Sequence, residues 1–242
     1  MLNNRYFILC FTLLCSGNSF AQSENHWQFV LTPVLWNASV KARLSDSNSG
    51  GGDLPIDPDY RFFSLENLDD YLSLKFEANH GRFGILFDSL RARYQDETEN
   101  NLVNVIVGTE LGFIELSARY QLVDEHELDL IGGVRRIFLD IDQTLVPGPA
   151  FKQSYSWTDP LIGLRYHYPI SSKWHTWLRG DIAGFGVGTQ RSINITADIQ
   201  YLLNSSISFT VGYRYLDIEF KEDDVLYEVI LDGIYLGLGI HF

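Results

Sequence analysis

Apolar and polar residues alternate with a period of two along most of the chain from residue 26 onward, which is the pattern of β-strands. The last predicted strand places its large apolar side chains on a single face: Ile234, Leu236, Leu238, Ile240 and Phe242. The residues between them are mostly small or polar. One face of this strand therefore suits an apolar environment, and the other suits water or hydrogen-bonding partners.

The same alternation recurs in residues 114–121, 193–201 and 207–215. A soluble β-sandwich also alternates, but it must pack its apolar faces against each other and protect its edges. A transmembrane barrel turns the apolar face to lipid and uses segments of about ten residues or more. The length of the segments favours the antiparallel transmembrane up-and-down β-barrel.

Ten strands are predicted, an even number, as expected for a single-chain bacterial barrel. They span residues 26–42, 70–80, 82–95, 105–123, 126–143, 156–168, 173–187, 192–203, 206–220 and 226–242. Eight strands are the alternative if the weak segments 60–72 or 104–110 belong to loops.

Long connections alternate with tight turns in this assignment. The long ones are residues 43–69, 96–104 and 144–155, and the tight ones lie at 81, 124–125, 169–172 and 204–205. Long extracellular loops and short periplasmic turns would place both termini in the periplasm. Pro33 and Pro160 cannot donate a ladder hydrogen bond, so each is expected at a bulge or a rim.

The first 21 residues have the features of a cleaved signal peptide. Arg5 precedes an apolar run over residues 6–15, and the small residues Ser19 and Ala21 predict cleavage after Ala21. The apolar run is about half the ~20 residues that a transmembrane helix needs. The mature chain, residues 22–242, is expected to form one barrel domain.

Both cysteines, Cys10 and Cys15, lie in the predicted signal peptide, and each follows a leucine where lipoprotein processing needs a small residue. The mature chain is therefore expected to lack disulfides, thiolate metal sites and a lipid anchor. The full chain carries a formal net charge of −13. Nucleic acid is not an expected partner, since phosphate binding needs a concentrated basic face.

Several segments share motifs with a known family. They are residues 157–166 (WTDPLIGLRY), Trp174, 178–188 (LRGDIAGFGVG), 211–217 (VGYRYLD) and 235–239 (YLGLG), together with 27–36 and 68–88. These segments resemble a widespread family of small, poorly characterised Gram-negative outer-membrane β-barrel proteins. The resemblance implies a cell outer-membrane barrel with no established reaction and no cofactor.

The last strand also resembles the C-terminal recognition signal of outer-membrane barrels, which implies the barrel-assembly machinery and periplasmic chaperones as partners. One position departs from the family pattern. Two strands carry Gly-x-Arg-Tyr, at residues 163–166 and 212–215, whereas residues 133–136 end in Arg136 at the lipid-facing position. Because arginine is costly at the membrane midplane, the register or depth of this strand is in question.

The polar faces of the strands supply nearly balanced charges to the predicted lumen. The candidates are Lys75, Glu77, Asp88, Glu115, Arg119, Asp129, Arg135, Asp159, Arg165, Arg179, Asp181, Asp198 and Arg214. Charges inside a narrow barrel survive desolvation when they are paired and hydrogen-bonded, so one hypothesis is an ion-paired plug. The other is a selectivity constriction in a narrow passive pore for small solutes.

The inward-facing polar residues suggest two further kinds of chemistry. Carboxylate pairs such as Asp159 and Asp181 are suitable for acid–base work, but nearby arginines would hold both ionised, which disfavours catalysis. The 6 histidines fall at predicted periplasmic strand ends or turns, and His26, His167, His175 and His241 share the inward parity. A pH-gated mouth is one hypothesis. No metal-ligand spacing appears, so no metal is expected.

Aromatic residues near the predicted periplasmic ends form a candidate interfacial girdle. They are Trp27, Tyr120, Tyr166, Tyr168, Trp174, Tyr201 and Phe242. Arg91 and Arg93 lie toward the outer end of their strand, where lipopolysaccharide phosphates are candidate contacts. Outer-membrane lipid and lipopolysaccharide are therefore expected partners.

The sequence favours a structural or narrow passive-pore barrel that is not an enzyme. One alternative is a surface-binding or adhesion barrel that acts through its extracellular loops. The other is an outer-membrane hydrolase of lipid A or peptides, which would need a nucleophile or an acid–base set near the outer rim.

Overall fold

The computed structural model describes residues 26–46, 54–61, 68–99, 104–123, 127–146, 150–222 and 225–242. The predicted signal peptide lies outside these residues, as does His126. The strands are β1 (Gln28–Asp46), β2 (Leu54–Arg61), β3 (Leu68–His80), β4 (Phe83–Glu99), β5 (Asn104–Val123), β6 (Leu128–Val146), β7 (Ala150–Pro169), β8 (Trp174–Gly184), β9 (Arg191–Leu202), β10 (Ile207–Glu222) and β11 (Val225–His241). In the part of the chain that the structure describes, no helix is long and apolar enough to span a membrane.

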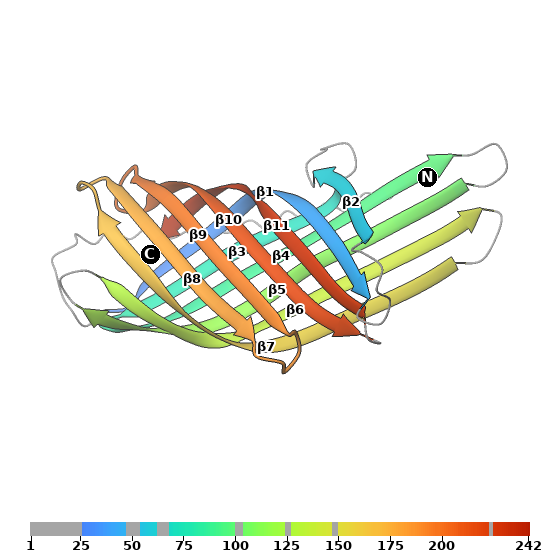
Figure 1. Cartoon of the computed structure of the whole chain (residues 1–242). Helices are drawn as coiled ribbons and strands as arrows, with labels where there is room; N and C mark the ends of the chain where they lie inside the picture. The colour runs from blue at the N-terminus through green and yellow to red at the C-terminus, as the bar shows by residue number, and fades with distance from the viewer. Residues whose placement is uncertain are drawn as a thin grey trace.

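Ten of these strands form a closed antiparallel barrel, in which each strand pairs with its sequence neighbours and β11 returns to β1 (Figure 1). The closing ladder runs from Val30 opposite His241 to Asp46 opposite Val225. Phe29 and Phe242 exchange two backbone hydrogen bonds at its inner end, of 2.9 and 3.0 Å. The prediction of an up-and-down barrel of ten strands is confirmed, and the alternative of eight strands is wrong.

The eleventh strand, β2, was missed, because the region 43–69 was predicted to be a loop. Among the described residues, β2 pairs only with β1, over residues 39–44 of that strand. Its sequence, LPIDPDYR, alternates in polarity apart from Pro55, but it is only eight residues long and contains two prolines, which are atypical of a strand inside a sheet. β3 pairs with the inner part of β1, from Gln28 opposite Asn79 to Pro33 opposite Leu74.

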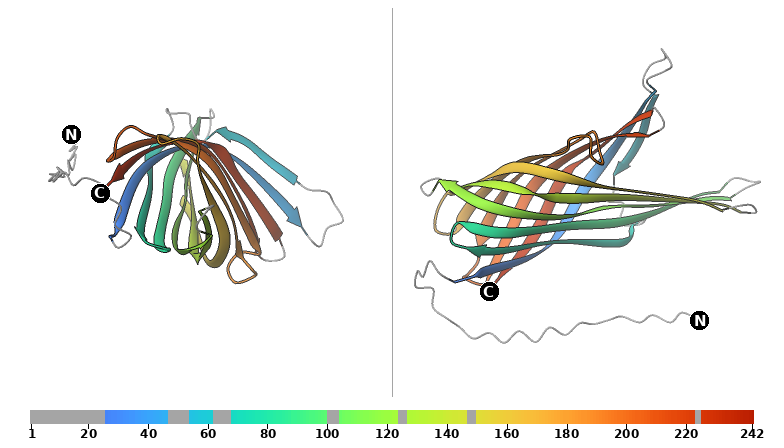
Figure 2. Two further views of the ribbon diagram at one scale, coloured as in Figure 1. Left: turned by 90° about the vertical axis from the view of Figure 1, so that its left-hand side faces the viewer. Right: turned by 90° about the horizontal axis from the view of Figure 1, so that it is seen from below.

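Two hairpins are longer than predicted. The segments 96–99 and 144–146, expected in loops, continue β4 and β6, and residues 150–155 belong to β7. β5 and β7 each have 20 residues, whereas β8 has 11 and β9 has 12. Twenty residues extend about 66 Å, roughly twice the ~30 Å hydrocarbon thickness of a bilayer. The outer ends of β4–β7 therefore project well past the β8–β9 turn (Figure 2).

Pro33 and Pro160 each lie where a ladder stops. Pro160 pairs with Val134 on the β6 side, while the β7–β8 ladder begins one residue later, at Leu161. Its position at a local rim agrees with the prediction. Pro33 lies inside β1 without a register shift, so the expected bulge is absent there, and instead the β1–β3 ladder ends at this residue. β6 also keeps continuous register through Arg136, which faces Ile114 and Thr158.

Candidate functional site

The charged residues predicted for the lumen all occupy inward-facing positions. Eight are buried: Asp88, Glu115, Asp129, Arg135, Asp159, Arg165, Asp181 and Arg214. The other five, Lys75, Glu77, Arg119, Arg179 and Asp198, are partly buried. The structure separates them into a central network, a turn anchor near the β8–β9 turn and a wide chamber at the end where β1 begins and β11 ends.

Two arginines and two carboxylates from β5, β6 and β8 form the central network across the lumen. Arg135 contacts Glu115 at 2.7 Å and Asp181 at 2.6 Å. Arg179 contacts the same two carboxylates at 2.6 and 2.8 Å. Neither the Glu115 nor the Arg135 side chain has any solvent-exposed surface. Each cation therefore bridges both anions, which is the arrangement that makes buried charges tolerable.

Hydrogen bonds extend this network toward β4, β9 and β10. Asn194 donates to Asp181 at 2.7 Å and accepts from Arg214 at 2.9 Å. Arg214 in turn pairs with Asp88 at 2.9 Å and lies over the ring of Phe113, 4.5 Å from its centroid. The result is a continuous polar layer that joins opposite walls of the barrel.

Beyond this layer, toward the ends of the long β4–β7 hairpins, the lumen is filled by apolar side chains, which the sequence analysis did not predict. They include Trp36, Ala38, Leu90, Leu111, Phe113, Ile137, Leu216, Ile218, Phe220 and Leu231, all buried in one cluster. The alternation had predicted polar residues at these inward-facing positions. The signal was present in the sequence, because residues 216–220 read Leu-Asp-Ile-Glu-Phe, with polarity reversed relative to residues 207–215.

Asp159 anchors the short outer turn between β8 and β9. Its carboxylate accepts hydrogen bonds from the backbone N–H groups of Gly188 and Thr189, at 3.0 and 2.8 Å, and from the Thr189 hydroxyl at 2.9 Å. The turn needs left-handed backbone at Gly184 and Gly186, with φ of 99° and 73°. Asp159 thus acts on a turn, and Asp181 belongs to the arginine network, so the two do not form an acid–base pair.

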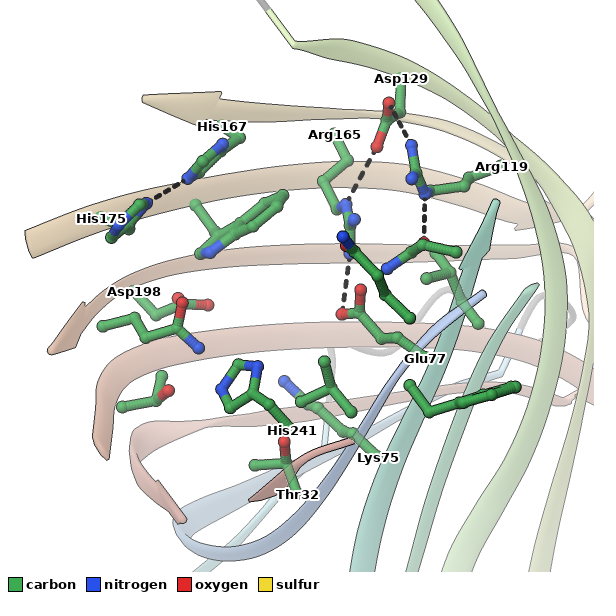
Figure 3. A pocket seen from close by; sticks show the side chains of 18 of the residues that line it. Thr32, Lys75, Glu77, Arg119, Asp129, Arg165, His167, His175, Asp198 and His241 are labelled. Carbon is green, nitrogen blue, oxygen red and sulfur yellow. Dashed lines mark hydrogen bonds and ion pairs between the residues drawn. The ribbon is translucent and has the colours of Figure 1, made fainter. Parts of the chain in front are cut away.

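The half of the lumen nearest residues 26–30 and the C-terminal Phe242 is a chamber of about 1230 Å³, here called the vestibule (Figure 3). On one wall, Arg165 pairs with Glu77 at 2.8 Å and with Asp129 at 3.3 Å. Arg119 pairs with Asp129 at 3.1 Å and donates to Asn79 at 2.7 Å. The Glu77 side chain keeps 31% exposure, so water of the chamber can hydrate it, whereas the side chains of Arg165 and Asp129 are at most 9% exposed.

Lys75, Asp198 and Tyr235 form a separate group on the opposite side of the vestibule (Figure 3 labels the two charged residues). The Lys75 ammonium nitrogen lies 4.4 Å from the centroid of the Tyr235 ring. The Tyr235 hydroxyl donates to the Asp198 carboxylate at 2.5 Å. The phenol therefore links a cation to an anion without a direct ion pair between them.

Histidines lie at the mouth of the vestibule, and His26, His167, His175 and His241 all line it. His167 Nδ1 donates to Glu127, a turn residue, which holds the pKa of the Glu127 carboxyl below its usual range. His167 Nε2 lies 2.8 Å from His175 Nδ1. Among the described residues, no group of three or more His, Asp or Glu side chains is placed to hold a metal ion.

The outer surface of the barrel carries an exposed apolar band. It includes Ile85, Ile114, Leu116, Leu130, Val134, Ile162, Leu164, Leu178, Ile182, Ile195, Ile199, Val211, Ile234, Leu236 and Leu238. From the predicted girdle, Trp27, Tyr120, Tyr168, Trp174 and Phe242 are exposed, while Tyr166 and Tyr201 are partly buried. An apolar exterior around a polar interior is the inverse of a soluble protein and is typical of a membrane-spanning barrel.

Arg136 marks the outer edge of this band. It is exposed two residues beyond Val134 on β6, and it donates to the Ser156 hydroxyl at 3.3 Å. The question of depth is thus answered by position, because the long side chain can reach the polar headgroup level. Arg91, also near the outer edge, pairs with Glu110 at 2.7 Å.

Comparisons with known proteins agree with this architecture. Residues 158–242, about a third of the chain, match the model of a family described as YfaZ precursor. This match covers most of β7 and all of β8–β11. The chain is a β-barrel of the outer-membrane type, and the predicted resemblance to small Gram-negative outer-membrane barrels is confirmed.

Remote similarities to solved structures were also found. The Yersinia pestis protein Ail, in complex with the heparin analogue sucrose octasulfate, is 14% identical, with a TM-score of 0.40 over 90% of this chain and 99% of Ail. The Escherichia coli outer membrane protease OmpT is 10% identical, with a TM-score of 0.44 over 93% and 99% of the two chains. The translocator domain of NalP from Neisseria meningitidis is 12% identical, with a TM-score of 0.45 over 90% and 89%. No curated protein matched the sequence.

Proposed function

We propose that this protein is a closed, non-conducting barrel that stabilises the outer membrane and presents a water-filled vestibule to the periplasm. The central network carries this proposal. Arg135 and Glu115 have no exposed surface, and their partners come from opposite parts of the wall. An ion could cross only by displacing these paired charges, which would leave uncompensated charge in a dry interior.

The apolar cluster strengthens the closure. Trp36, Phe113 and Leu216 are at most 3% exposed and fill the lumen outward of the network. A hydrophobic constriction excludes water and ions even where charges would admit them. Two layers of opposite chemistry therefore block the same path, which favours the structural reading over the passive pore.

The same geometry supports a non-enzymatic role. Asp159 is fully occupied by the Gly188–Thr189 turn, and Asp181 by two arginines and Asn194. A general acid or base needs a free position for the proton that it transfers. We therefore propose that the protein does not hydrolyse lipid A or peptides, and incubation of the purified barrel with both substrates tests this.

The surface chemistry supports an orientation with both termini in the periplasm and the long β4–β7 hairpins outside. Arg136 and Arg93 are exposed near the outer edge of the apolar band, where phosphates of lipopolysaccharide would lie. Their outward position supports contacts with lipopolysaccharide. Protease accessibility of the hairpin tips on intact cells tests the orientation.

Single-channel conductance in a planar bilayer tests the closed lumen. The folded wild-type barrel is expected to give no steady current at moderate voltage. A Glu115→Ala/Arg135→Ala variant removes the central pair together, and any current that it gains would map the closure to the network. Steady, ion-selective conductance of the wild type would contradict the proposal and favour the passive pore.

A further inference from the structure

Among the described residues that line the vestibule, Lys75 is a cation and Asp198 an anion that no ion pair neutralises. Arg119 and Arg165 are matched by Glu77 and Asp129 through three contacts of 2.8 to 3.3 Å. Within the described part of the chain, the only partner found for the Lys75 ammonium group is the Tyr235 ring.

The nearest candidate partner of Lys75 pairs with another cation. Asp88 lies directly across the β3–β4 ladder from Lys75, but its Oδ2 pairs with Arg214 at 2.9 Å, and its Oδ1 makes no hydrogen bond with any described residue, Lys75 included. Asp198 stands near Lys75 on the Tyr235 side, yet it accepts its short hydrogen bond from the Tyr235 hydroxyl. Lys75 and Asp198 thus face the chamber as separate, opposite charges held apart by one phenol ring.

We propose that the vestibule binds a small zwitterion, an amino acid or a short peptide with free termini. Its carboxylate pairs with Lys75, and its ammonium group pairs with Asp198. Charge-assisted hydrogen bonds of this kind are about twice as strong as neutral ones. A ligand with one charge of each sign leaves the chamber neutral, whereas a simple anion or cation would satisfy one group and leave the other.

The chamber has the size and walls for such a ligand. Its volume of about 1230 Å³ exceeds the ~300–1,000 Å³ of typical small-molecule pockets, so a short peptide fits with water around it. Phe29, Val30 and Trp177 also line the chamber and offer apolar surface to side chains. The mouth opens on the periplasm, so the ligand does not need to pass the closed lumen.

Titration calorimetry of the detergent-solubilised barrel with L-alanyl-L-alanine tests the proposal, with intrinsic tryptophan fluorescence as a second readout, since Trp177 lines the chamber. N-acetyl-alanyl-alanine lacks the ammonium charge and alanyl-alanine amide lacks the carboxylate. Each capped peptide is expected to bind at least about tenfold more weakly than alanyl-alanine, because it loses one charged contact.

Variants assign each terminus to its residue. Lys75→Met should weaken binding of alanyl-alanine about tenfold but leave the already weak binding of the amide unchanged. Asp198→Asn keeps an acceptor for Tyr235 and should show the same pattern with the N-acetyl peptide. Lys173→Met, which removes a lysine from an exposed turn outside the vestibule lining, is the matched control and should bind like the wild type.

Three results would overturn the proposal: no binding by a barrel shown to be folded, equal binding of free and capped peptides, or wild-type affinity in Lys75→Met. Folding is checked by gel electrophoresis, because an unfolded barrel migrates more slowly than a folded one. Conductance is measured on the same preparation. A barrel that conducts ions and binds the dipeptide would refute only the closed lumen. A barrel that neither conducts ions nor binds the dipeptide would refute only the zwitterion site.

Discussion

The central network and the vestibule wall use the same chemistry in different surroundings. In both, two arginines share two carboxylates, but the central contacts of Arg135 measure 2.6 and 2.7 Å with no exposed surface. The contacts of Arg165 measure 2.8 and 3.3 Å, and its partner Glu77 keeps 31% exposure. Because the two groups share residue types and differ most in the exposure of Glu77, we expect access to water, rather than residue type, to decide what an ion pair contributes inside a barrel.

The largest effect is expected for Arg135→Met. It leaves Glu115 with one cation fewer in a site that water cannot reach, and the expected loss is about 3–5 kcal/mol of unfolding free energy. Urea unfolding in lipid vesicles measures it. The neighbouring Arg136→Met faces outward and serves as the control. If the two variants unfold alike, the central network does not differ from surface charge.

A second, smaller effect is expected for Asp159→Ala. The part-buried N–H of Gly188, the buried N–H of Thr189 and the Thr189 hydroxyl would lose their shared acceptor, which should cost about 2–3 kcal/mol. The β8–β9 turn should also become sensitive to proteases, and mass spectrometry would locate the cut. Asp159→Asn keeps one acceptor oxygen and should fall between alanine and the wild type.

Arg165→Met sharpens the comparison from the hydrated side. Glu77 can be resolvated by vestibule water and Asp129 keeps its contact with Arg119, so the expected loss is only about 1 kcal/mol. The same urea titration applies. A loss as large as that of Arg135→Met would show that the vestibule is dry, and the contrast between the two regions would collapse.

The smallest effect concerns pH at the mouth. The pKa of Glu127 is depressed by its hydrogen bond from His167, so its contribution to stability is present above the unfolded pKa of ~4.3 and is lost as pH falls through the folded value. Because Glu127 is about half exposed, the contribution should stay under about 1 kcal/mol. Wild type should exceed Glu127→Gln in stability at pH 7 and match it near pH 3. A difference that grows on acidification would contradict this.

Periodicity predicted much of the fold because alternation states which face each residue takes. It placed Glu115, Arg135 and Asp181 on the inner face, but face alone cannot say which charges meet, since that depends on the stagger between strands. It missed the apolar layer because a single in–out polarity was assumed along each strand. Where the wall leaves the hydrocarbon, the outward residues become polar, as at Asp217 and Glu219, and the inward residues are free to be apolar.

The closing ladder between β1 and β11 has a kinetic consequence for assembly. Neighbouring hairpins can form from local contacts, whereas the Trp36 indole bonds the Gly233 carbonyl across 197 positions and Arg214 reaches Asp88 across 126. Long-range contacts of this kind form late, because closing such a loop costs chain entropy before the contacts can stabilise the fold. The interior contacts thus stabilise the closed barrel last. Until β11 pairs with β1, Arg214 lacks its Asp88 partner across the barrel, and the unclosed sheet can still unfold.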